Sequence, residues 1–456
     1  MRRVRLLAGL LFAIVACGGD GDDGGMPDPA IVAAVRGLAR PLAGLPGELD
    51  PLVAQLGAAD VVVIGDGTHG SEEFYRLRAD LTKQLVTERG FRAVVVEADW
   101  AKVARANDAV QGRTADPDPL GELRGFPAWM WRNTAVRDFV EWLRALDSTA
   151  TADSTVGLYG MDLQDLHTPW QRILAYLDVH APASASLARE RRQCFRPGEE
   201  EAPAQYAARV AGRPDATCAS SVAAELQDIA ALETSERTRG GEAVRAWFDA
   251  YESARALVDA ERYFRTADPT DPAPAWNLRD QHMADTAEAV MSYLAGVSPT
   301  APPPAGSARI VIWCHNSHAG DSASTQAGDD GEVTLGTFVR ERHAGSAFLL
   351  GLTTYGGTVM AASTWGQSGQ RMQLRPARGD SWEGAFHAAR LPSFLLMFGD
   401  PQPPPPVLDV DRLERAVGVV YMVSSELQSH YFRARIRQQF DAVIHLDQTS
   451  AVQPLD

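Results

Sequence analysis

Cysteine is scarce in this chain, with four residues among 456 and no two of them in a CxxC pair. Zinc ribbons and thioredoxin-type redox motifs need such pairs, so both are excluded. Cys17 falls in an N-terminal export pattern, and Cys314 ends an apolar run where a small buried residue is expected. Cys194 and Cys218 flank a polar, helix-rich stretch. In an exported protein they can pair or remain reduced, and the sequence leaves both outcomes open.

Positive charge is also in deficit. The formal net charge is −16, and the first 16 residues hold three arginines and no acid, so the rest of the chain is more negative still. The excess of acid argues against nucleic acid and anionic lipid as partners. The composition is otherwise ordinary, 45% hydrophobic and 22% charged, which is typical of a globular protein with a large core.

The sequence lacks two common catalytic and phosphate-binding motifs. It has no Gly-x-Ser-x-Gly elbow, which disfavours a nucleophilic serine, and no GxxxxGK[ST] phosphate loop. Glycines 65, 67 and 70 have the GxGxxG spacing of a dinucleotide site, and Glu97 lies where a ribose-binding acid would be. The histidine inside this loop nevertheless argues against a nucleotide-binding site.

The only candidate membrane segment lies at the N-terminus and is too short to cross a bilayer. Three arginines within the first five residues precede the apolar residues 6–16, which is the pattern of a signal peptide. The run ends Ile-Val-Ala-Cys and resembles a bacterial lipobox. We therefore expect lipidation of Cys17, with an ordinary secretory signal as the alternative. Residues 18–25 are all Gly or Asp and predict a solvated tether on a protein anchored in the cell envelope, on its periplasmic or outer side.

The stretch Gly65–Gly70, Gly-Asp-Gly-Thr-His-Gly, joins two predicted elements. It follows Val61–Ile64, an apolar β-branched run typical of a buried strand, and precedes residues 71–89, which have helical periodicity. Its three glycines permit tight backbone geometry and close approach of a ligand. A strand-to-helix loop is where open α/β sheets bind ligands, and this one carries three polar side chains: Asp66, Thr68 and His69.

Two further strand ends carry polar side chains to the same edge. Residues 91–96 form a predicted strand that ends in Glu97, and a strand–helix–strand unit of this length implies parallel strands. Residues 309–314 form another predicted strand, which is followed by two histidines. We therefore expect a functional crevice lined by His69, Glu97, His315 and His318.

The rest of the chain predicts an α/β fold with a central, largely parallel sheet of seven or eight strands flanked by helices. A strand at 156–161 ends at Asp162, an aromatic-rich helix contains Trp129, and later apolar runs lie at 347–352, 392–397, 418–422 and 442–446. The predicted organisation is a signal peptide (1–16), a lipidated cysteine with a flexible tether and lead-in (17–50), a catalytic α/β domain in two parts (51–166 and 266–456), and an α-helical insertion between them (167–265).

Two chemistries fit the predicted crevice. In the first, His69 is a general base that takes a proton from water, Glu97 or Asp66 orients its ring, and Arg78 or a second histidine stabilises an oxyanion. In the second, the histidines and carboxylates hold a metal that generates hydroxide. A His-x-x-His that follows a strand is a looser signal than His-Glu-x-x-His within a helix. The metal-free chemistry is therefore favoured, and no cofactor is expected.

Several motifs occur in order: Gly65–Gly70, Arg78 nine residues after His69, Glu97-Ala98, and Trp313–His318. In this order they resemble the erythromycin esterase family, which also takes in proteins related to succinoglycan biosynthesis. The likeness runs from about residue 50 to the end. The family pattern has glutamate where Asp66 stands, so the side chain here is one methylene shorter.

The resemblance implies an α/β fold with a helical insertion and a cleft between them. It implies hydrolysis of a macrolide lactone by a water that His69 activates, with these residues around it: Asp66, Arg78, Glu97, His315 and His318. We expect substrate contacts from Thr68, Asn316, Asp162 and Trp129. Substrate choice lies in the cleft walls, so we expect a carboxylic ester or lactone hydrolase whose small-molecule substrate is open. The alternatives are a haem- or metal-binding lipoprotein of related fold and a non-catalytic family member.

Overall fold

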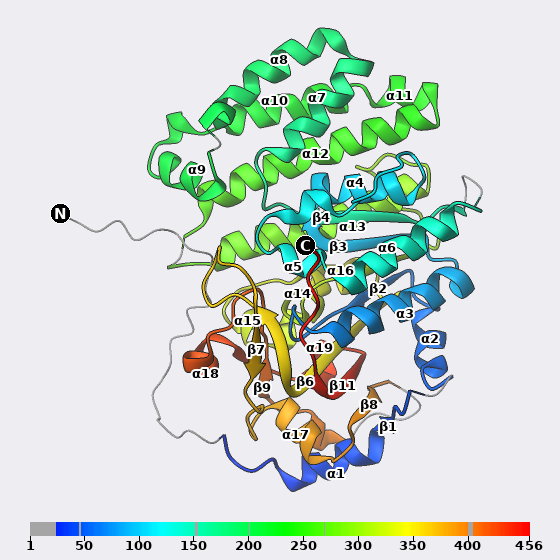
Figure 1. The fold of residues 1–456 in the computed structure, drawn as a ribbon, viewed down its shortest axis with the longest axis vertical. Helices are drawn as coiled ribbons and strands as arrows, with labels where there is room; N and C mark the ends of the chain where they lie inside the picture. The colour runs from blue at the N-terminus through cyan, green and yellow to red at the C-terminus, as the bar shows by residue number, and fades with distance from the viewer. Residues whose placement is uncertain (1–23, 45–46, 151–153, 200, 269, 400–404) are drawn as a thin grey trace, which may run out of the picture.

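The computed structural model describes residues 24–44, 47–150, 154–199, 201–268, 270–399 and 405–456. The predicted signal peptide, the lipidation site Cys17 and most of the tether lie outside these residues. Figure 1 shows an α/β body with a layer of helices stacked on one end. Among the described residues, no helix is both long and apolar enough to cross a membrane.

A nine-stranded sheet runs through the α/β body. In spatial order it contains β1 (Arg40–Pro41), β8 (Ser393–Met397), β11 (Ala442–Thr449), β6 (Ala347–Ala361), β2 (Val61–Ile64), β5 (Ile310–Trp313), β3 (Ala93–Asp99) and β4 (Gly157–Asp162), and β7 (Gln370–Leu374) pairs with β6. The strands from β11 to β4 are parallel neighbours, whereas β1, β8 and β7 form antiparallel pairs. The predicted α/β class with a largely parallel sheet is confirmed.

Both faces of the sheet are covered, which explains the uninterrupted apolar runs of its central strands. In β2, Val61 and Val63 join one hydrophobic core, while Val62 and Ile64 join the other. The second core contains residues of α2 (Asp50–Leu56), α3 (Glu72–Arg89) and α6 (Thr134–Asp147). The first contains residues of α1 (Pro29–Leu38), α13 (Ala273–Leu294), α16 (Leu335–Arg342) and α17 (Trp382–Ala388). Residues of α4 (Trp100–Val110) contribute to both cores.

Two local predictions were wrong. The run 418–422 forms no strand, because its residues make only an isolated bridge between Ala362 and Val420. The predicted aromatic-rich helix is divided into α5 (Ala128–Trp131) and α6, because the side chain of Asn133 caps α6 by accepting from Val136 N–H.

The stretch predicted as an insertion consists of helices that stack on the α/β body (Figure 1). They are α7 (Thr168–His180), α8 (Pro182–Arg192), α9 (Pro203–Val210), α10 (Ala219–Ala230), α11 (Glu233–Arg239) and α12 (Glu242–Thr266). Their apolar side chains belong to the same core as one face of the sheet. The helical layer is therefore packed continuously onto the body, and α13 follows it directly in the chain.

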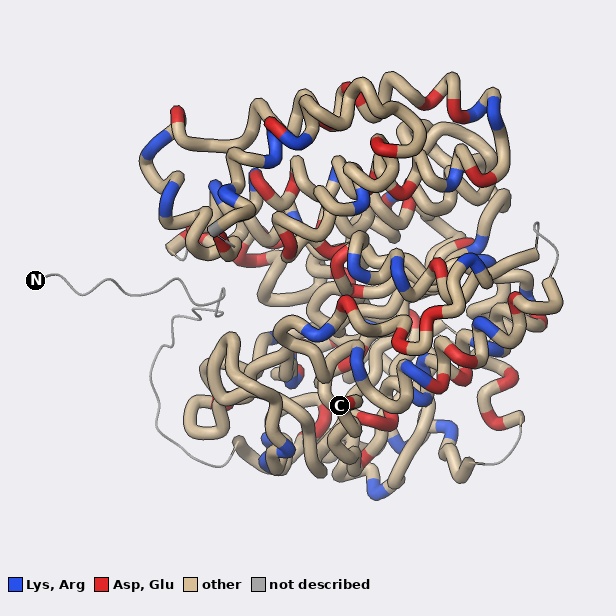
Figure 2. Tube along the Cα trace, turned by 45° about the horizontal axis from the view of Figure 1, so that its top comes forward, with Lys and Arg blue, Asp and Glu red and all other residues tan. Residues whose placement is uncertain are grey.

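Acidic and basic residues are interspersed across this layer (Figure 2). Many of them pair, as in the contacts of Arg191 with Glu225 and Asp228 and of Arg189 with Asp178. Glu225 is 1% exposed, and burial raises its pKa despite the contact with Arg191.

Cys194 and Cys218 form a disulfide across 24 residues, which resolves the choice that the sequence leaves open. We expect the double substitution Cys194→Ser, Cys218→Ser to lower the free energy of unfolding by about 3–4 kcal/mol, because a loop of this length is then unconstrained in the unfolded chain. Chemical denaturation with and without reductant measures this. The reduced wild type is the matched control, and equal midpoints for all samples would contradict the expectation.

Candidate functional site

The register of the parallel strands brings three strand ends together. Ile64 of β2 pairs with Trp313 of β5, and Trp313 pairs with Val96 of β3. The residues that follow these positions therefore share one edge of the sheet. They include the predicted side chains Asp66, His69, Glu97, His315 and His318.

The glycines of the loop after β2 are required by protein packing. A Cβ on Gly65 would lie 2.2 Å from Asn316 Oδ1, and one on Gly70 would lie 1.9 Å from Met360 O. The sequence predicted that these glycines let a ligand approach the backbone closely. At these two positions the groups that approach belong to the protein itself. Gly70 O accepts from Met360 N–H (3.1 Å) and Val452 N–H (2.9 Å). The loop is fixed from both β6 and the C-terminal segment.

The C-terminal segment 450–456 runs along this loop and on to α5. Glu72 N–H, at the start of α3, donates to Ser450 O (2.8 Å), and Leu455 N–H donates to Arg132 O (2.9 Å). The last residues of the chain therefore hold the entry to α3 in place.

His69 lies between two carboxylates. Its Nδ1 is 3.3 Å from Asp66 Oδ1, and its Nε2 is 3.9 Å from Glu97 Oε1. Burial acts to raise the pKa of Asp66, but Arg78 and His69 together lower it below its ordinary value, so Asp66 is ionised. An ionised neighbour favours the proton on Nδ1 and leaves the lone pair on Nε2. Asp66 is therefore the carboxylate nearest to Nδ1 of the ring, although its side chain is shorter than the family's glutamate.

Arg78 supports Asp66. The guanidinium is 1% exposed, and its Nη1 is 2.7 Å from Asp66 Oδ2. Its hydrogen bonds go to main-chain carbonyls at two strand ends, Ile64 O and Cys314 O. These contacts favour a positioning role for Arg78 over the predicted role as an oxyanion donor.

Glu97 is fixed by an arginine from α13. Arg279 Nη2 donates to Glu97 Oε1 (2.8 Å), and the same guanidinium binds both oxygens of Asp162 at 2.8–2.9 Å. Burial alone would raise the pKa of Glu97, yet His318, His69 and Arg279 hold it well below its usual range. Because both oxygens of Asp162 are bound to Arg279, Asp162 supports this ion-pair network, and its predicted substrate contact is not favoured.

His318 is held on three sides. Its Nδ1 is 2.9 Å from Asp280 Oδ1, its Nε2 is 2.9 Å from Arg279 Nη1, and its ring stacks on Trp276 at 4.5 Å. This geometry places a proton on Nδ1 and makes Nε2 the acceptor for Arg279. Burial opposes a second proton, but Asp280 and Glu97 outweigh it and raise the pKa of His318.

His315 is a neutral donor beside His69. Its Nδ1 accepts from Ser317 N–H (3.2 Å), so its proton lies on Nε2. Burial lowers the pKa of His315 to about 3, and Nε2 is buried without a hydrogen-bond partner among the described residues. The rings of His315 and His69 are 4.7 Å apart. This arrangement offers an N–H to a ligand oxygen.

The other predicted substrate contacts serve the protein itself. Thr68 Oγ1 bonds to Ser71 Oγ, and the amide of Asn316 bonds to Leu352 O (3.1 Å) and Glu414 Oε1 (3.2 Å). Both side chains hold loops together, because their polar atoms are bound and buried. Trp129 is 4% exposed and packs against Gly369, and its Nε1 has no partner in the described structure.

The site is nearly enclosed. His69 is 5% exposed, Glu97 6% and His315 3%, so these side chains of the predicted crevice are largely buried. The closure comes partly from α13, whose Arg279 and Trp276 reach residues at the strand ends. Among the described residues, no three or more His, Cys, Asp or Glu side chains are arranged to hold a metal.

The pair Arg279-Asp280 also resembles a segment of the erythromycin esterase family, but the sequence assigned neither residue to the site. Both lie on a helix about 180 residues from Glu97 in the chain, and no periodicity links them to it. Trp276 was missed in the same way. The only usable signal was the family-like Arg279-Asp280 pair.

Glu332 is a further carboxyl near Asp280 and His318. The side chain of Asn277 holds its loop by bonding to Gly331 O (3.0 Å) and Val333 N (2.7 Å). Burial, together with the negative charges of Asp280 and Asp330, raises the pKa of Glu332 to about 7. Its Oε2 is buried without a partner in the described residues.

We expect Glu332→Gln to stabilise the protein at alkaline but not at acid pH. The pKa of Glu332 is about 7 in the folded chain and about 4.5 in the unfolded chain. Ionisation therefore costs more in the folded chain, and the free energy of unfolding falls as pH rises from about 4.5 through about 7. The variant should gain on the order of 1 kcal/mol at pH 8 and nothing near pH 4.5. Thermal unfolding at both pH values tests this, with the exposed Glu341→Gln as control. An equal gain at both pH values would exclude the titration of Glu332 as the cause.

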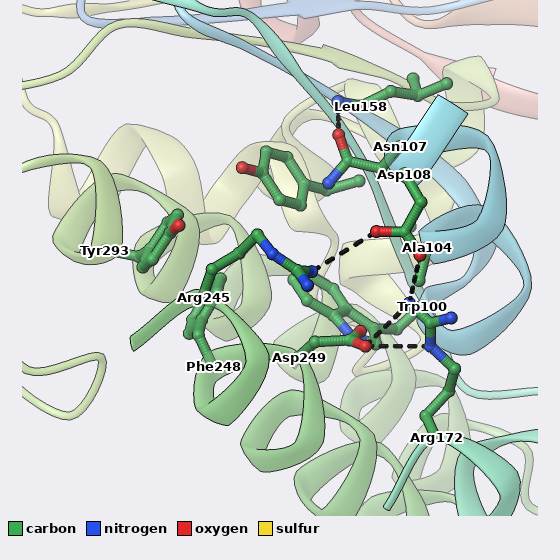
Figure 3. Close-up of a pocket in the computed structure, with 12 residues that line it drawn as sticks. Trp100, Ala104, Asn107, Asp108, Leu158, Arg172, Arg245, Phe248, Asp249 and Tyr293 are labelled. Carbon is green, nitrogen blue, oxygen red and sulfur yellow. Dashed lines mark hydrogen bonds and ion pairs between the residues drawn. The ribbon is translucent and has the colours of Figure 1, made fainter. Parts of the chain in front are cut away.

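A separate polar cavity lies between α4 and the helical layer, away from these strand ends (Figure 3). It encloses about 20 Å³, room for one or two water molecules and too little for a substrate. Arg172 binds Asp108 (3.0 Å) and Asp249 (2.9 Å) across it. This network fastens α7 and α12 to α4.

Comparison with known proteins gives consistent results. A family model described as erythromycin esterase matches residues 86–449. The fold is similar to a crystal structure of a succinoglycan biosynthesis protein, with 19% identity, a TM-score of 0.72, and coverage of 93% of this chain and 98% of that one. It is also similar to a Bacillus cereus protein, with 16% identity, a TM-score of 0.75, and coverage of 94% of this chain and 99% of that one. A third similar structure is a mutant of the erythromycin esterase EreC in its open conformation, with 18% identity, a TM-score of 0.61, and coverage of 89% of this chain and 94% of that one.

Proposed function

The chain belongs to the erythromycin esterase family, and on that premise we propose that it hydrolyses a carboxylic ester or lactone with a water that His69 activates. One observation carries the proposal. The imidazole of His69 contacts ionised Asp66 through Nδ1, while its Nε2 faces Glu97 beside the neutral donor His315. This is the arrangement that a general base and an oxyanion donor need.

In the proposed reaction, His69 Nε2 takes a proton from water and the hydroxide attacks the acyl carbon. The resulting tetrahedral intermediate carries negative charge on the acyl oxygen, which accepts a hydrogen bond from His315 Nε2–H. The C–O bond to the leaving group then breaks, and His69 returns the proton to the departing alkoxide. Asp66 and Glu97 stabilise the imidazolium between these two proton transfers.

His318 and Arg279 fix the Glu97 carboxylate in this scheme. Arg279 neutralises part of the negative charge of Glu97 and Asp162, so that Glu97 stays ionised in an enclosed site. His318 accepts from Arg279 at Nε2, 3.5 Å from Glu97 Oε1, and so helps to hold the guanidinium beside that carboxylate. We assign both to positioning.

The substrate is proposed only as a class, because the loops that carry the chemistry do not define what binds. Mass spectrometry on residues 18–456 incubated with macrolides, simpler lactones and linear esters tests the function. Gain of one water by a lactone, or cleavage of a linear ester into its acid and alcohol, dependent on His69, is the expected result. No product across the panel would contradict hydrolysis of these classes.

A parallel incubation with a strong chelator tests the metal-free chemistry. We expect activity to persist, because Arg279 binds Glu97 and Asp162, and Asp280 binds His318. Loss of activity that added zinc restores would favour a metal instead. Haem binding is less favoured, since both ring nitrogens of His318 and Nδ1 of His315 are engaged, which leaves Nε2 of His315 and Nε2 of His69 as the candidate iron ligands among these histidines.

We also propose that Cys17 carries a lipid that anchors the protein in the cell envelope, following the sequence pattern. Metabolic labelling with palmitate tests this, with Cys17→Ser as the control. Labelling of both proteins, or of neither, would contradict it.

A further inference from the structure

A tyrosine hydroxyl near the site has no hydrogen-bond partner. Tyr75 lies in the second turn of α3, six residues after His69, and is 1% exposed. Its Oη is buried and unpaired among the described residues. A buried hydroxyl without a partner costs folding free energy, so such groups are rare and call for an explanation.

Tyr75 lies between Trp131, which contacts Glu97, and Arg78, which contacts Asp66. On one side, its ring meets the edge of Trp131 at 6.1 Å, and Trp131 Nε1–H donates to Glu97 O (2.9 Å). On the other side, the guanidinium carbon of Arg78 is 5.7 Å from the ring centre, and Arg78 binds Asp66. The phenol is thus held at the site by packing, while its polar atom is left without an acceptor.

The hydroxyl can act only as a donor or a neutral acceptor. Burial raises the pKa of Tyr75 well above its ordinary value, and the nearby charges of Asp66 and Glu97 raise it further, despite Arg78. The phenol therefore stays protonated and cannot serve as a base. Asp66, Glu97 and Glu72 lie close enough to affect it electrostatically, yet no hydrogen bond joins any of them to Oη.

We propose that Tyr75 Oη–H donates a hydrogen bond to the acyl oxygen of the substrate, as a second donor beside His315 Nε2–H. The inference rests on the proposed ester hydrolysis and adds a catalytic residue to it. Two neutral donors would share the charge that develops on this oxygen in the transition state. Because that charge is absent in the bound ester, the bond would act on kcat more than on KM.

The test compares Tyr75→Phe with the wild type on a substrate that the panel identifies. The variant removes one oxygen and keeps the ring packed between Trp131 and Arg78. We expect kcat to fall about 100-fold with KM nearly unchanged. We expect the Tm to stay equal or rise, because no internal hydrogen bond is lost.

The matched control is Tyr176→Phe, the same change at a buried tyrosine of α7 beside Glu236, in the helical layer. It should leave kcat at the wild-type value. A Tm that falls by several degrees in Tyr75→Phe, or a kcat within twofold of wild type, would overturn the role of Tyr75 while leaving ester hydrolysis intact. A wild type that converts no member of the panel would overturn the proposed function and the inference together.

Discussion

His69→Ala is expected to lower kcat by about 10³-fold, because the substitution removes the group that takes a proton from the attacking water in the proposed reaction. The loop itself should survive, since its backbone bonds involve Gly70 O and His69 N–H rather than the imidazole. Stopped or continuous assays on an identified ester, with circular dichroism and Tm of the same preparation, measure both effects.

His387→Ala provides the matched control for this prediction. His387 is another histidine bonded to an aspartate, Asp447, but it is half-exposed and lies outside the site. Its removal should leave kcat unchanged. If His69→Ala retained more than a tenth of the wild-type kcat, the assignment of His69 as general base would be wrong.

Arg279→Met is expected to cause the largest loss of stability, about 3–5 kcal/mol. The substitution leaves Glu97 and Asp162 buried without the cation that binds both, and it removes the donor to His318 Nε2. Activity should fall as well, because Glu97 no longer has a fixed position. Urea unfolding gives the free energy, and kcat on the identified substrate gives the second effect.

Arg137→Met is the matched control, since Arg137 pairs with Asp138 on the surface and both are about half exposed. Such a pair contributes about 0–1 kcal/mol. Arg279→Lys separates charge from shape, because lysine keeps the cation but lacks the planar fork that binds two carboxylates. A loss below about 1 kcal/mol in Arg279→Met would show that the buried carboxylates find other partners.

The convergence of His69, Glu97 and His315 was predictable because it follows from strand direction. Three apolar runs predict buried parallel strands, and parallel strands place their ends on one edge. The roles of individual residues were less accessible. Asn316 and Arg78 belong to motifs that resemble those of the family, yet Asn316 binds Leu352 O and Arg78 binds Asp66. The sequence does not show which of its neighbours such a side chain binds.

The elements that the sequence did not predict have no hydrophobic periodicity that would indicate a strand or helix or the element it packs against. β9 (Arg412–Arg415) and β10 (Tyr431–Ala434) form a separate two-stranded sheet from charged, mixed sequences, so no apolar run announces them. The side chains that α13 brings to the site depend on where this helix packs after the helical layer. Its position is set by packing across the whole first core, which local sequence patterns do not encode.

The pairing of the segment 450–456 with the loop after β2 has a consequence for biogenesis. In the proposed export the chain would emerge N-terminus first, so Gly70 would reach the far side long before Val452, its partner. Until those last residues arrive, the loop bearing His69 would lack its support from the C-terminal segment. A nascent chain stalled short of residue 450 would therefore carry His69 and Glu97 without the full set of contacts that holds this loop.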